Sequence, residues 1–354
     1  MRTKFKGQLL MWCMACLWGA ALTACGGKNW HTAEGAVWHT TYRIVYHGDR
    51  PLEDSIVRVM AEVEESLSPF MEGSRISRIN RNETDTANAM IATAFGIAAK
   101  VSKASEGRFD PTVAPLVNLW GFGTDKTRRA LADSVADGSA LVVTQAEIDS
   151  ALALVGIDSC AINEHFIVKK KHEGTTFNFS SITKGLGCDM VASMLRRNGV
   201  TDYMVEIGGE VAAHGHNLRR TAWMIQIDSP EESLEAPVHD ALSVIPLDDC
   251  AVASSGNYRN FHDTKRYGRV GHTIDPITGM PVKGEVLAST VVAPTCGEAD
   301  AWATACMAVG DACKVIGMID AQPDVEAMIV VARGDSVATF VTGGFPKPVR
   351  CVSS

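Results

Sequence analysis

Two oxygen-bearing side chains stand one helical turn apart late in the chain. Asp300 and Thr304 are separated by four positions within an alanine-rich segment, and residues with this spacing lie on the same face of a helix. A carboxylate and a hydroxyl on one face can bind a hard cation such as Mg2+, which prefers oxygen ligands. The same letters also fit a solvated aspartate at a helix start followed by a core threonine, and spacing alone favours that plainer interpretation.

A lysine follows a serine-rich turn in the middle of the chain. Lys184 comes three residues after Ser181, in the segment Asn178-Phe179-Ser180-Ser181-Ile182-Thr183. We expect this turn to open a helix, where exposed backbone N–H groups and the ammonium group both favour an anionic phosphate. A surface lysine at a helix start is a common alternative, but we favour the phosphate site.

Three consecutive residues combine side chains that suit a nucleotide or flavin ring. Arg108, Phe109 and Asp110 provide a guanidinium group, an aromatic face and a carboxylate. Together these groups suit a planar ring with polar edges, such as adenine or isoalloxazine. An ordinary strand end can carry the same letters, so the tripeptide alone is a weak indication of a binding site.

One of the ten histidines lies in a segment typical of a loop that presents its side chains. His272 precedes Ile274-Asp275-Pro276 and is flanked by Gly271 and Gly279. A loop histidine beside a metal or a phosphate is a candidate general base. The alternative, a histidine that caps its own turn, fits the sequence equally well, and Asp275 is the next candidate base in the segment.

The elements that must position these groups mix helices and strands without a regular period. Apolar residues at helical spacing, with a capping box at Thr144 and Glu147, predict the helices, and alternating or β-branched stretches predict the strands. The order favours an α+β architecture, with mixed sheets, packed helices and two interleaved halves. The expected helices cover 52–67, 89–105, 144–155, 184–197 and 299–309, and the expected strands cover 35–46, 200–211, 223–227, 242–247, 250–254, 287–293, 327–332 and 337–342.

Length and composition limit the class of protein. The chain has 354 residues, of which 46% are hydrophobic and 21% are charged, and such a chain can bury a large core in one domain or two. It carries 33 Lys and Arg against 41 Asp and Glu, a net charge of -8. Because this balance indicates no basic surface, we expect no nucleic-acid partner.

The first 34 residues are typical of an export signal followed by an anchor. Three basic residues precede an apolar run at 9–22, which is too short to span a membrane comfortably. The run ends in Leu22-Thr23-Ala24-Cys25, which is similar to a bacterial lipobox. We therefore predict a signal peptide at 1–24, a lipidated Cys25 and a polar tether at 25–34. The alternatives are an ordinary signal peptide or a short signal anchor, with Cys25 incidental.

The cysteines do not predict a disulfide framework. Of the ten cysteines, seven remain besides Cys13, Cys16 and Cys25, and the chain has no CxxC pair. Export implies an oxidising compartment, where cysteines often pair. The odd number and sparse spacing nevertheless favour small buried apolar residues for most of the seven.

Five separated motifs resemble those of the ApbE-type flavin transferases, in the family's order and over residues 35–343. They lie at 66–80, 107–123, 178–185, 254–281 and 299–305, and include the FDPTV-x-PLV-x-LWGFG and H-x-IDP-x-TG-x-P blocks. The resemblance implies an ApbE-like fold, related to the T-fold, in a domain at 35–354 that binds FAD and uses Mg2+.

The resemblance also assigns roles to individual residues. The implied metal ligands are the Ser181 carbonyl oxygen and the side chains of Asp300 and Thr304, and His272 is the predicted catalytic base. Three places depart from the family pattern: Trp38 replaces a methionine, Ser181 stands where Ala or Gly is usual, and Asn178-Phe179-Ser180 replaces Asp-Leu-Gly, so one customary carboxylate is missing. The implied FAD-contacting residues are Trp38, Phe70, Arg108, Phe109, Asp110, Lys184, His272 and Ile274.

The implied activity transfers FMN from FAD to a Ser or Thr hydroxyl of a flavoprotein subunit, with Mg2+ screening the pyrophosphate and AMP leaving. The expected acceptor belongs to a membrane respiratory complex. The expected location is the periplasmic side of a bacterial membrane, held by the lipid, with the inner membrane favoured. One alternative is an FAD pyrophosphatase, in which water replaces the hydroxyl. Another is a flavin-binding lipoprotein without chemistry, which has no need of a cation and a base beside the pyrophosphate.

Overall fold

The computed structural model describes residues 28–133, 141–229, 241–256, 261–264, 266–334 and 336–351. The predicted signal peptide at 1–24 and the predicted lipid-bearing Cys25 therefore lie outside the described residues. In the segments that are described, no helix combines the length and the apolar character that crossing a membrane requires.

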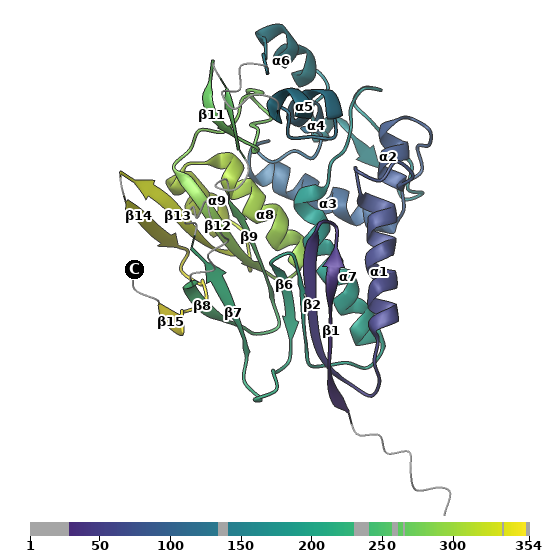
Figure 1. The fold of residues 1–354 in the computed structure, drawn as a ribbon, viewed down its shortest axis with the longest axis vertical. Coiled ribbons are helices and arrows are strands. Elements are labelled where there is room, and N and C mark those ends of the chain that lie inside the picture. The colour runs from purple at the N-terminus through teal and green to yellow at the C-terminus, as the bar shows by residue number, and fades with distance from the viewer. Residues whose placement is uncertain are drawn as a thin grey trace, which may run out of the picture.

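A large antiparallel sheet forms the centre of the fold (Figure 1). Every pairing between its neighbouring strands is antiparallel. The sheet joins segments from both ends of the chain, and the α+β prediction is confirmed. In spatial order its eight described strands are β1 (Asn29–Val37), β2 (Thr40–Gly48), β5 (Tyr203–Ile207), β6 (Glu210–His214), β9 (Ala251–Gly256), β12 (Val286–Ala293), β13 (Glu326–Arg333) and β14 (Ser336–Val341).

Helices cover one face of this sheet, and a second, smaller sheet covers the other. Ile44 and Tyr46 of β2 pack against the helices, whereas Val45 between them packs against the small sheet, because successive side chains of a strand alternate. The helices of this layer are α1 (Glu53–Leu67), α3 (Ala89–Ala104), α7 (Ser180–Arg197), α8 (Cys296–Val309) and α9 (Ala312–Asp320), and the small sheet contains β7 (Trp223–Asp228), β8 (Ala241–Leu247) and β15 (Arg350–Cys351).

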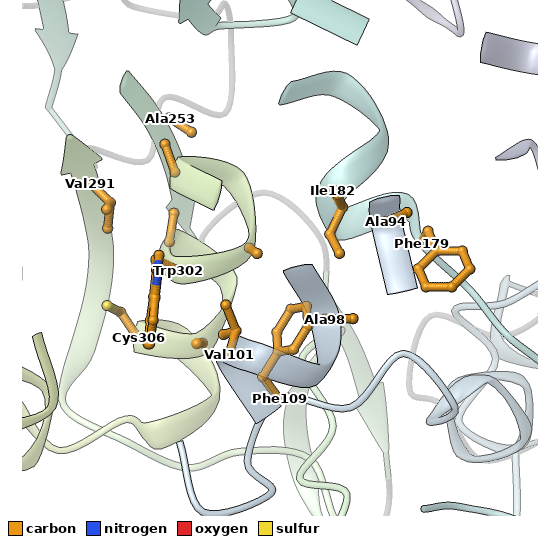
Figure 2. Packing of buried hydrophobic residues seen from close by; sticks show 14 of the residues in the cluster. Ala94, Ala98, Val101, Phe109, Phe179, Ile182, Ala253, Val291, Trp302 and Cys306 are labelled. Atoms are coloured by element: carbon orange, nitrogen blue, oxygen red, sulfur yellow. The ribbon is translucent and has the colours of Figure 1, made fainter. Parts of the chain in front are cut away.

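The centre of the helical layer is closely packed around α8. Trp302 and Cys306 of this helix are fully buried, and Figure 2 shows them between Val291 of the sheet and Val101 of α3. Small alanine side chains on α3 and α8 allow the two helices to approach closely. The helix that carries Asp300 is therefore a rigid part of the core.

A smaller unit packs around its own apolar cluster at one end of the molecule (Figure 1). Leu116, Trp120 and Ile148 form the cluster, and Ile274 from a distant loop completes it. The elements of this region are α4 (Ala114–Leu119), α5 (Lys126–Asp133), α6 (Gln145–Leu152), β10 (Phe261–Thr264) and β11 (Gly268–Gly271). Elsewhere lie α2 (Arg75–Asn80), the 3-10 helix η1 (Ile157–Ser159), β3 (Ala161–Ile162) and β4 (Val168–Lys169).

The start of the fold differs from the prediction. Residues 29–34, which we assigned to a tether, belong to β1, and each of them pairs with a residue of β2. The predicted strand at 35–46 is therefore a hairpin, which turns at Trp38 and His39, both with positive φ. The polar composition of residues 29–34 misled the prediction, because an exposed edge strand needs few apolar residues.

Other boundaries also shift. The strand predicted at 200–211 is the hairpin of β5 and β6, which turns at Gly208 and Gly209 with φ of 65° and 98°. Thr144 and Glu147 form the predicted capping box, but the helix ends at Leu152. Helices α7 and α8 begin earlier than predicted, at Ser180 and Cys296. The Thr295 side chain caps α8 by accepting a hydrogen bond from the Glu298 N–H, whereas Phe179 makes no side-chain cap on α7.

The cysteines that the structure describes form no disulfide. Cys188, Cys296 and Cys306 are buried, Cys160 and Cys250 are partly buried, and Cys313 is exposed. Three of these six thiols are core residues, and Cys160 and Cys250 also pack against the apolar clusters.

Helices α7 and α8 meet at a glycine and an aspartate. A Cβ on Gly185 would lie 2.2 Å from the backbone oxygen of Cys296, so the two helices can approach only because this position has no side chain. Four residues on, the Asp189 carboxylate accepts hydrogen bonds from the backbone N–H groups of Cys296 and Gly297 at 2.9 and 2.8 Å. Burial raises the pKa of Asp189 to about 6. This contact fixes the start of α8.

We predict that Gly185→Ala destabilises the protein by about 1–3 kcal/mol, the usual cost of overpacking a core. The reason is that the backbone of Cys296 cannot yield as a flexible side chain can. Thermal unfolding followed by circular dichroism measures the effect. Gly96→Ala is the matched control, because this position of α3 has no atom within 4 Å of an added Cβ; alanine there should raise stability by about 1 kcal/mol. Equal transitions for Gly185→Ala and wild type would contradict the prediction.

Candidate active site

A cavity of about 330 Å3 gathers most of the predicted site residues. Its volume is in the range of small-molecule sites. The side chains come from the α1–α2 loop, the α3–α4 loop, the first turns of α7, the loop after β11 and the middle of α8, which are far apart in the sequence. The predicted residues that line it are Phe70, Arg108, Phe109, Asp110, Ser181, Lys184, His272, Ile274, Asp300 and Thr304.

A lysine between two buried carboxylates forms the charged part of the cavity. The Nζ atom of Lys184 donates a hydrogen bond to Oε1 of Glu210 at 2.7 Å and lies 3.7 Å from Oδ1 of Asp300. The two acids are 2% and 1% exposed, whereas 34% of the Lys184 side chain is exposed. Burial lowers the pKa of Lys184, but the charges of Asp300 and Glu210 outweigh it and raise that pKa above its usual value. The ammonium group therefore stays charged.

The predicted metal ligands lie on the same wall. Asp300 and Thr304 are on α8, and Ser181 is in the first turn of α7. Oδ2 of Asp300 accepts a hydrogen bond from the Gly185 N–H at 3.1 Å, so Oδ1 is the carboxylate oxygen nearer Lys184. A carboxylate, a hydroxyl and a carbonyl are oxygen donors that suit a hard divalent cation. The described residues contain no cluster of three or more His, Cys, Asp or Glu side chains that could hold a metal. Of the three predicted ligands, Asp300 is the one acid.

An ion pair joins two loops beside the cavity. The Arg108 guanidinium donates to Oδ2 of Asp275 at 2.6 Å. Asp275 also accepts hydrogen bonds from the Thr278 hydroxyl at 2.9 Å and the Ile277 N–H at 3.0 Å. Because both of its oxygens have partners, Asp275 is a poor candidate for a general base. It instead ties the loop of His272 to the segment of Arg108.

Asp110 is similarly engaged within the protein. Its Oδ1 accepts hydrogen bonds from the backbone N–H and the hydroxyl of Thr112 at 2.7 and 2.6 Å, and its Oδ2 accepts one from the Ile157 N–H at 2.9 Å. Burial raises its pKa above the ordinary value, although these hydrogen bonds oppose the shift. Asp110 thus holds the shape of the α3–α4 loop, and direct contact with FAD remains a prediction. Phe109 is 4% exposed and belongs to the core.

His272 lies outside regular structure, as the sequence predicts. It follows β11 and precedes the isolated bridge between Ile274 and Pro281. The ring of Phe122 contacts the imidazole edge-on, with ring centroids 6.3 Å apart. Both residues line the same cavity as the other predicted groups.

The two other aromatic residues predicted to contact FAD, Phe70 and Trp38, differ in whether they line the cavity. Phe70 lines the cavity and is 60% exposed, so its ring is available to a ligand. Trp38 is not among the lining residues; its ring packs on α7, 2.6 Å from where a Cβ of Gly187 would lie. The prediction that Trp38 contacts FAD therefore lacks support from the cavity. A tryptophan in a tight hairpin turn packs against the adjacent helix, and sequence position does not reveal that direction.

Sequence reasoning missed two residues of this region. Glu210 was counted only as part of a strand, although an acid directly before Val211-Ala212-Ala213 is a signal that it needs a buried partner. Ser255 lines the cavity, and its hydroxyl lies 3.4 Å from that of Thr304. No spacing rule links Ser255 to α8, because the two residues meet only through the sheet.

The fold is an antiparallel sheet backed by helices, and its cavity combines a charged lysine, a buried aspartate and oxygen donors. These features define an α+β enzyme suited to phosphate groups. Comparison with known proteins gives the particular family. The family model described as "ApbE family" matches residues 38–329. The chain belongs to the ApbE family, and the resemblance noted in the sequence is confirmed.

Relatives with a shared name match most of the chain. An FAD:protein FMN transferase of Vibrio cholerae is 32% identical over 321 residues, which are 88% of this chain and 90% of that protein. A protein of the same name from Haemophilus influenzae is 32% identical over 291 residues, 78% of this chain and 80% of that protein.

Solved structures agree with this fold. The flavin transferase ApbE from Vibrio cholerae superposes with a TM-score of 0.75 at 30% identity, and the match covers 90% of this chain and 98% of that one. The apo flavinyl transferase ApbE of Pseudomonas stutzeri gives a TM-score of 0.75 at 28% identity, with 90% and 96% covered. The prediction of an ApbE-like fold is confirmed.

We predict that Asp275→Asn weakens FAD binding about tenfold. Loss of a buried charge-assisted hydrogen bond costs about 1.5–3 kcal/mol, and the low end of this range applies because Arg108 is partly exposed. The amide keeps an acceptor for the Ile277 N–H but no longer fixes the guanidinium. Titration of FAD fluorescence measures the dissociation constant, and Asp311→Asn, an N-cap of α9 outside the cavity lining, is the control. If Arg108→Met weakens binding and Asp275→Asn does not, then Arg108 acts without this partner.

Proposed function

We propose that this chain is an FAD:protein FMN transferase, which moves FMN from FAD onto a hydroxyl of a flavoprotein acceptor. The observation that carries the proposal is the cavity, where residues from five separated motifs meet. The names of the relatives from Vibrio cholerae and Haemophilus influenzae support the same activity. In this reaction the hydroxyl oxygen forms a bond to the FMN phosphorus, the bond from that phosphorus to the bridging oxygen breaks, and AMP leaves with that oxygen.

The residues of the cavity fit the charges of this reaction. Lys184 offers an ammonium group to the pyrophosphate, and Phe70 offers an exposed ring to a flavin or adenine base. His272 is the proposed acceptor of the hydroxyl proton. When bound by Asp300, Thr304 and the Ser181 carbonyl, Mg2+ would screen the pyrophosphate charge. Because most of these side chains sit on core helices or tied loops, positioning is the main contribution of the protein.

Two alternatives use the same cavity. An FAD pyrophosphatase would transfer FMN to water, and a flavin carrier would bind FAD without chemistry. The buried Asp300 argues against a carrier, since a binding protein gains nothing from a costly buried acid beside the pyrophosphate. The names of the relatives favour a protein acceptor over water.

The acceptor and the location of the enzyme are further parts of this proposal. We propose a Ser or Thr acceptor on a flavin-bearing subunit of a membrane respiratory complex. A lipid on Cys25 would hold the enzyme on the periplasmic side of the bacterial membrane, with the inner membrane favoured. Since β1 begins at Asn29, only a few residues would separate the lipid from the fold, and the enzyme would work close to the membrane surface.

The decisive experiment incubates the protein with FAD, with and without Mg2+ and a flavoprotein acceptor. We predict AMP release together with a mass increase of the acceptor equal to bound FMN. Asp300→Asn should lower the rate about 100-fold or more, because it removes the single charged ligand. Asp320→Asn, an exposed acid at the end of α9, is the matched control. AMP release without acceptor modification would identify a pyrophosphatase, and FAD binding without AMP release would identify a carrier.

We predict that His272→Gln slows FMN transfer by about 10²–10⁴-fold, the usual contribution of a general base, with little change in FAD affinity. The wild-type rate should fall as the pH is lowered, because only the neutral imidazole can accept a proton. Rates from pH 5 to 8 measure both effects, and the exposed His165→Gln is the control. Normal transfer with poor FAD binding in His272→Gln would make His272 a binding residue instead.

We predict that Cys25→Ser moves the protein from the membrane to the soluble fraction, because the lipid would lose its attachment atom. Cell fractionation with an antibody measures the distribution. The matched control is Cys13→Ser, within the expected signal peptide, which should leave the distribution unchanged. Membrane retention of Cys25→Ser with an unprocessed N-terminus would favour a signal anchor.

A further inference from the structure

Glu210 has an unusual environment behind the cavity wall. The residue is 2% exposed; its Oε1 accepts the hydrogen bond from Lys184, whereas its Oε2 is buried and has no hydrogen-bond partner among the described residues. Burial raises its pKa. A buried acid with one unsatisfied oxygen costs free energy that an apolar residue would not. The position therefore calls for a function other than stability.

The backbone brings Glu210 to Lys184 through a tight turn. Glu210 is the first residue of β6, directly after Gly208 and Gly209. A Cβ on Gly208 would lie 3.1 Å from Cδ of Lys184, so the turn passes close beside the lysine stem. This approach places the Glu210 carboxylate within hydrogen-bond distance of the ammonium group, which also has Asp300 nearby.

The two acids compete for one ammonium group, and the ammonium group competes with a cation for one oxygen. Lys184 is 2.7 Å from Glu210 and 3.7 Å from Oδ1 of Asp300. The other oxygen of Asp300 is already held by the Gly185 N–H. If Glu210 were absent, Asp300 would be the remaining acid beside Lys184, and the ammonium group would close on Oδ1. Oδ1 would then be neutralised, although it is the oxygen best placed to bind a metal ion.

We propose that Glu210 is a positioning residue that holds the Lys184 ammonium group away from Asp300 and so keeps Oδ1 of Asp300 available to a divalent cation. The inference rests on the proposed Mg2+ site. It explains why an acid is buried beside a lysine that already has a partner in Asp300. Glu210 also keeps the Lys184 ammonium group on the cavity wall, where a phosphate group of the substrate can bind both the ammonium group and the metal ion.

The test measures binding of Mn2+, as a spectroscopic substitute for Mg2+, to the purified full chain by electron paramagnetic resonance, without FAD and without turnover. Glu210→Gln keeps an acceptor of nearly the same shape but removes the charge that holds Lys184. We expect its Mn2+ dissociation constant to rise about 10–100-fold, the range found when a residue that orients a metal ligand is changed. Glu206→Gln is the matched control, because this acid lies on the other side of the same turn and bonds to the Gly209 N–H instead of Lys184; it should bind Mn2+ like wild type.

A second pair of variants separates positioning from general electrostatics. In a Lys184→Met background no ammonium group is present to close on Asp300, so adding Glu210→Gln should change Mn2+ affinity far less than it does in wild type. An equal loss in both backgrounds would overturn the inference, since it would show that Glu210 acts only through its negative charge. If Glu210→Gln does not fold, Glu210→Asp, whose carboxylate is drawn back from Lys184, is compared in the same two backgrounds with the same two readings.

The outcomes distinguish this inference from the proposed function. A wild-type Mn2+ site that Glu210→Gln leaves unchanged would overturn the role of Glu210 alone. Absence of Mn2+ binding to wild type, in a chain that still transfers FMN, would overturn the metal site and this inference with it. Weaker Mn2+ binding that depends on Lys184 would support both.

Discussion

The close contact between α7 and α8 is the constraint on which the rest of the site depends. Gly185 lets the backbone of Cys296 approach α7, and Asp189 binds the first free N–H groups of α8, which have no partners within their own helix. Lys184 stands next to Gly185 on one helix, and Asp300 stands one turn after Cys296 on the other. The distance between the ammonium group and the acid is therefore set by how closely two core helices pack, and not by the conformation of a surface loop.

Charge balance is the second constraint. Buried acids are costly unless they are paired, and here Glu210 and Asp300 share the one ammonium group of Lys184. When both acids are ionised, the group of three carries an excess of one negative charge, which suits a region that receives a divalent cation. A pyrophosphate arriving with that cation would bring further negative charge, and Lys184 is placed to meet it. The charges of the site are thus better balanced when the cation and the pyrophosphate are bound than when the cavity is empty.

The remaining wall of the cavity is held by a different interaction. The Arg108–Asp275 pair joins segments 167 residues apart, and Ile274 anchors the same loop in the apolar cluster of the small helical unit. His272 is thereby held at the edge of the cavity although it lies outside regular structure. The charged centre is set by helices of the main core, whereas the proposed base is set by a loop tied at two points. A change in the charged centre would therefore affect ion binding, whereas a change in the loop of His272 would affect proton transfer.

The sequence by itself determined the helices with strong apolar periodicity, the α+β class and the residue types of the site, because these depend on local patterns and on side-chain chemistry. Ten of the predicted residues line one cavity as a result. Only the tertiary structure decided which of them touch. The Gly185–Asp300 hydrogen bond spans 115 positions and the Lys184–Glu210 bond spans 26, so no local pattern encodes them. The same limit explains what local patterns did not show: Trp38 packs on α7, residues 29–34 form an edge strand and not the predicted tether, and Asp275 pairs with Arg108. Each depends on a partner that folding, and not sequence proximity, brings into contact.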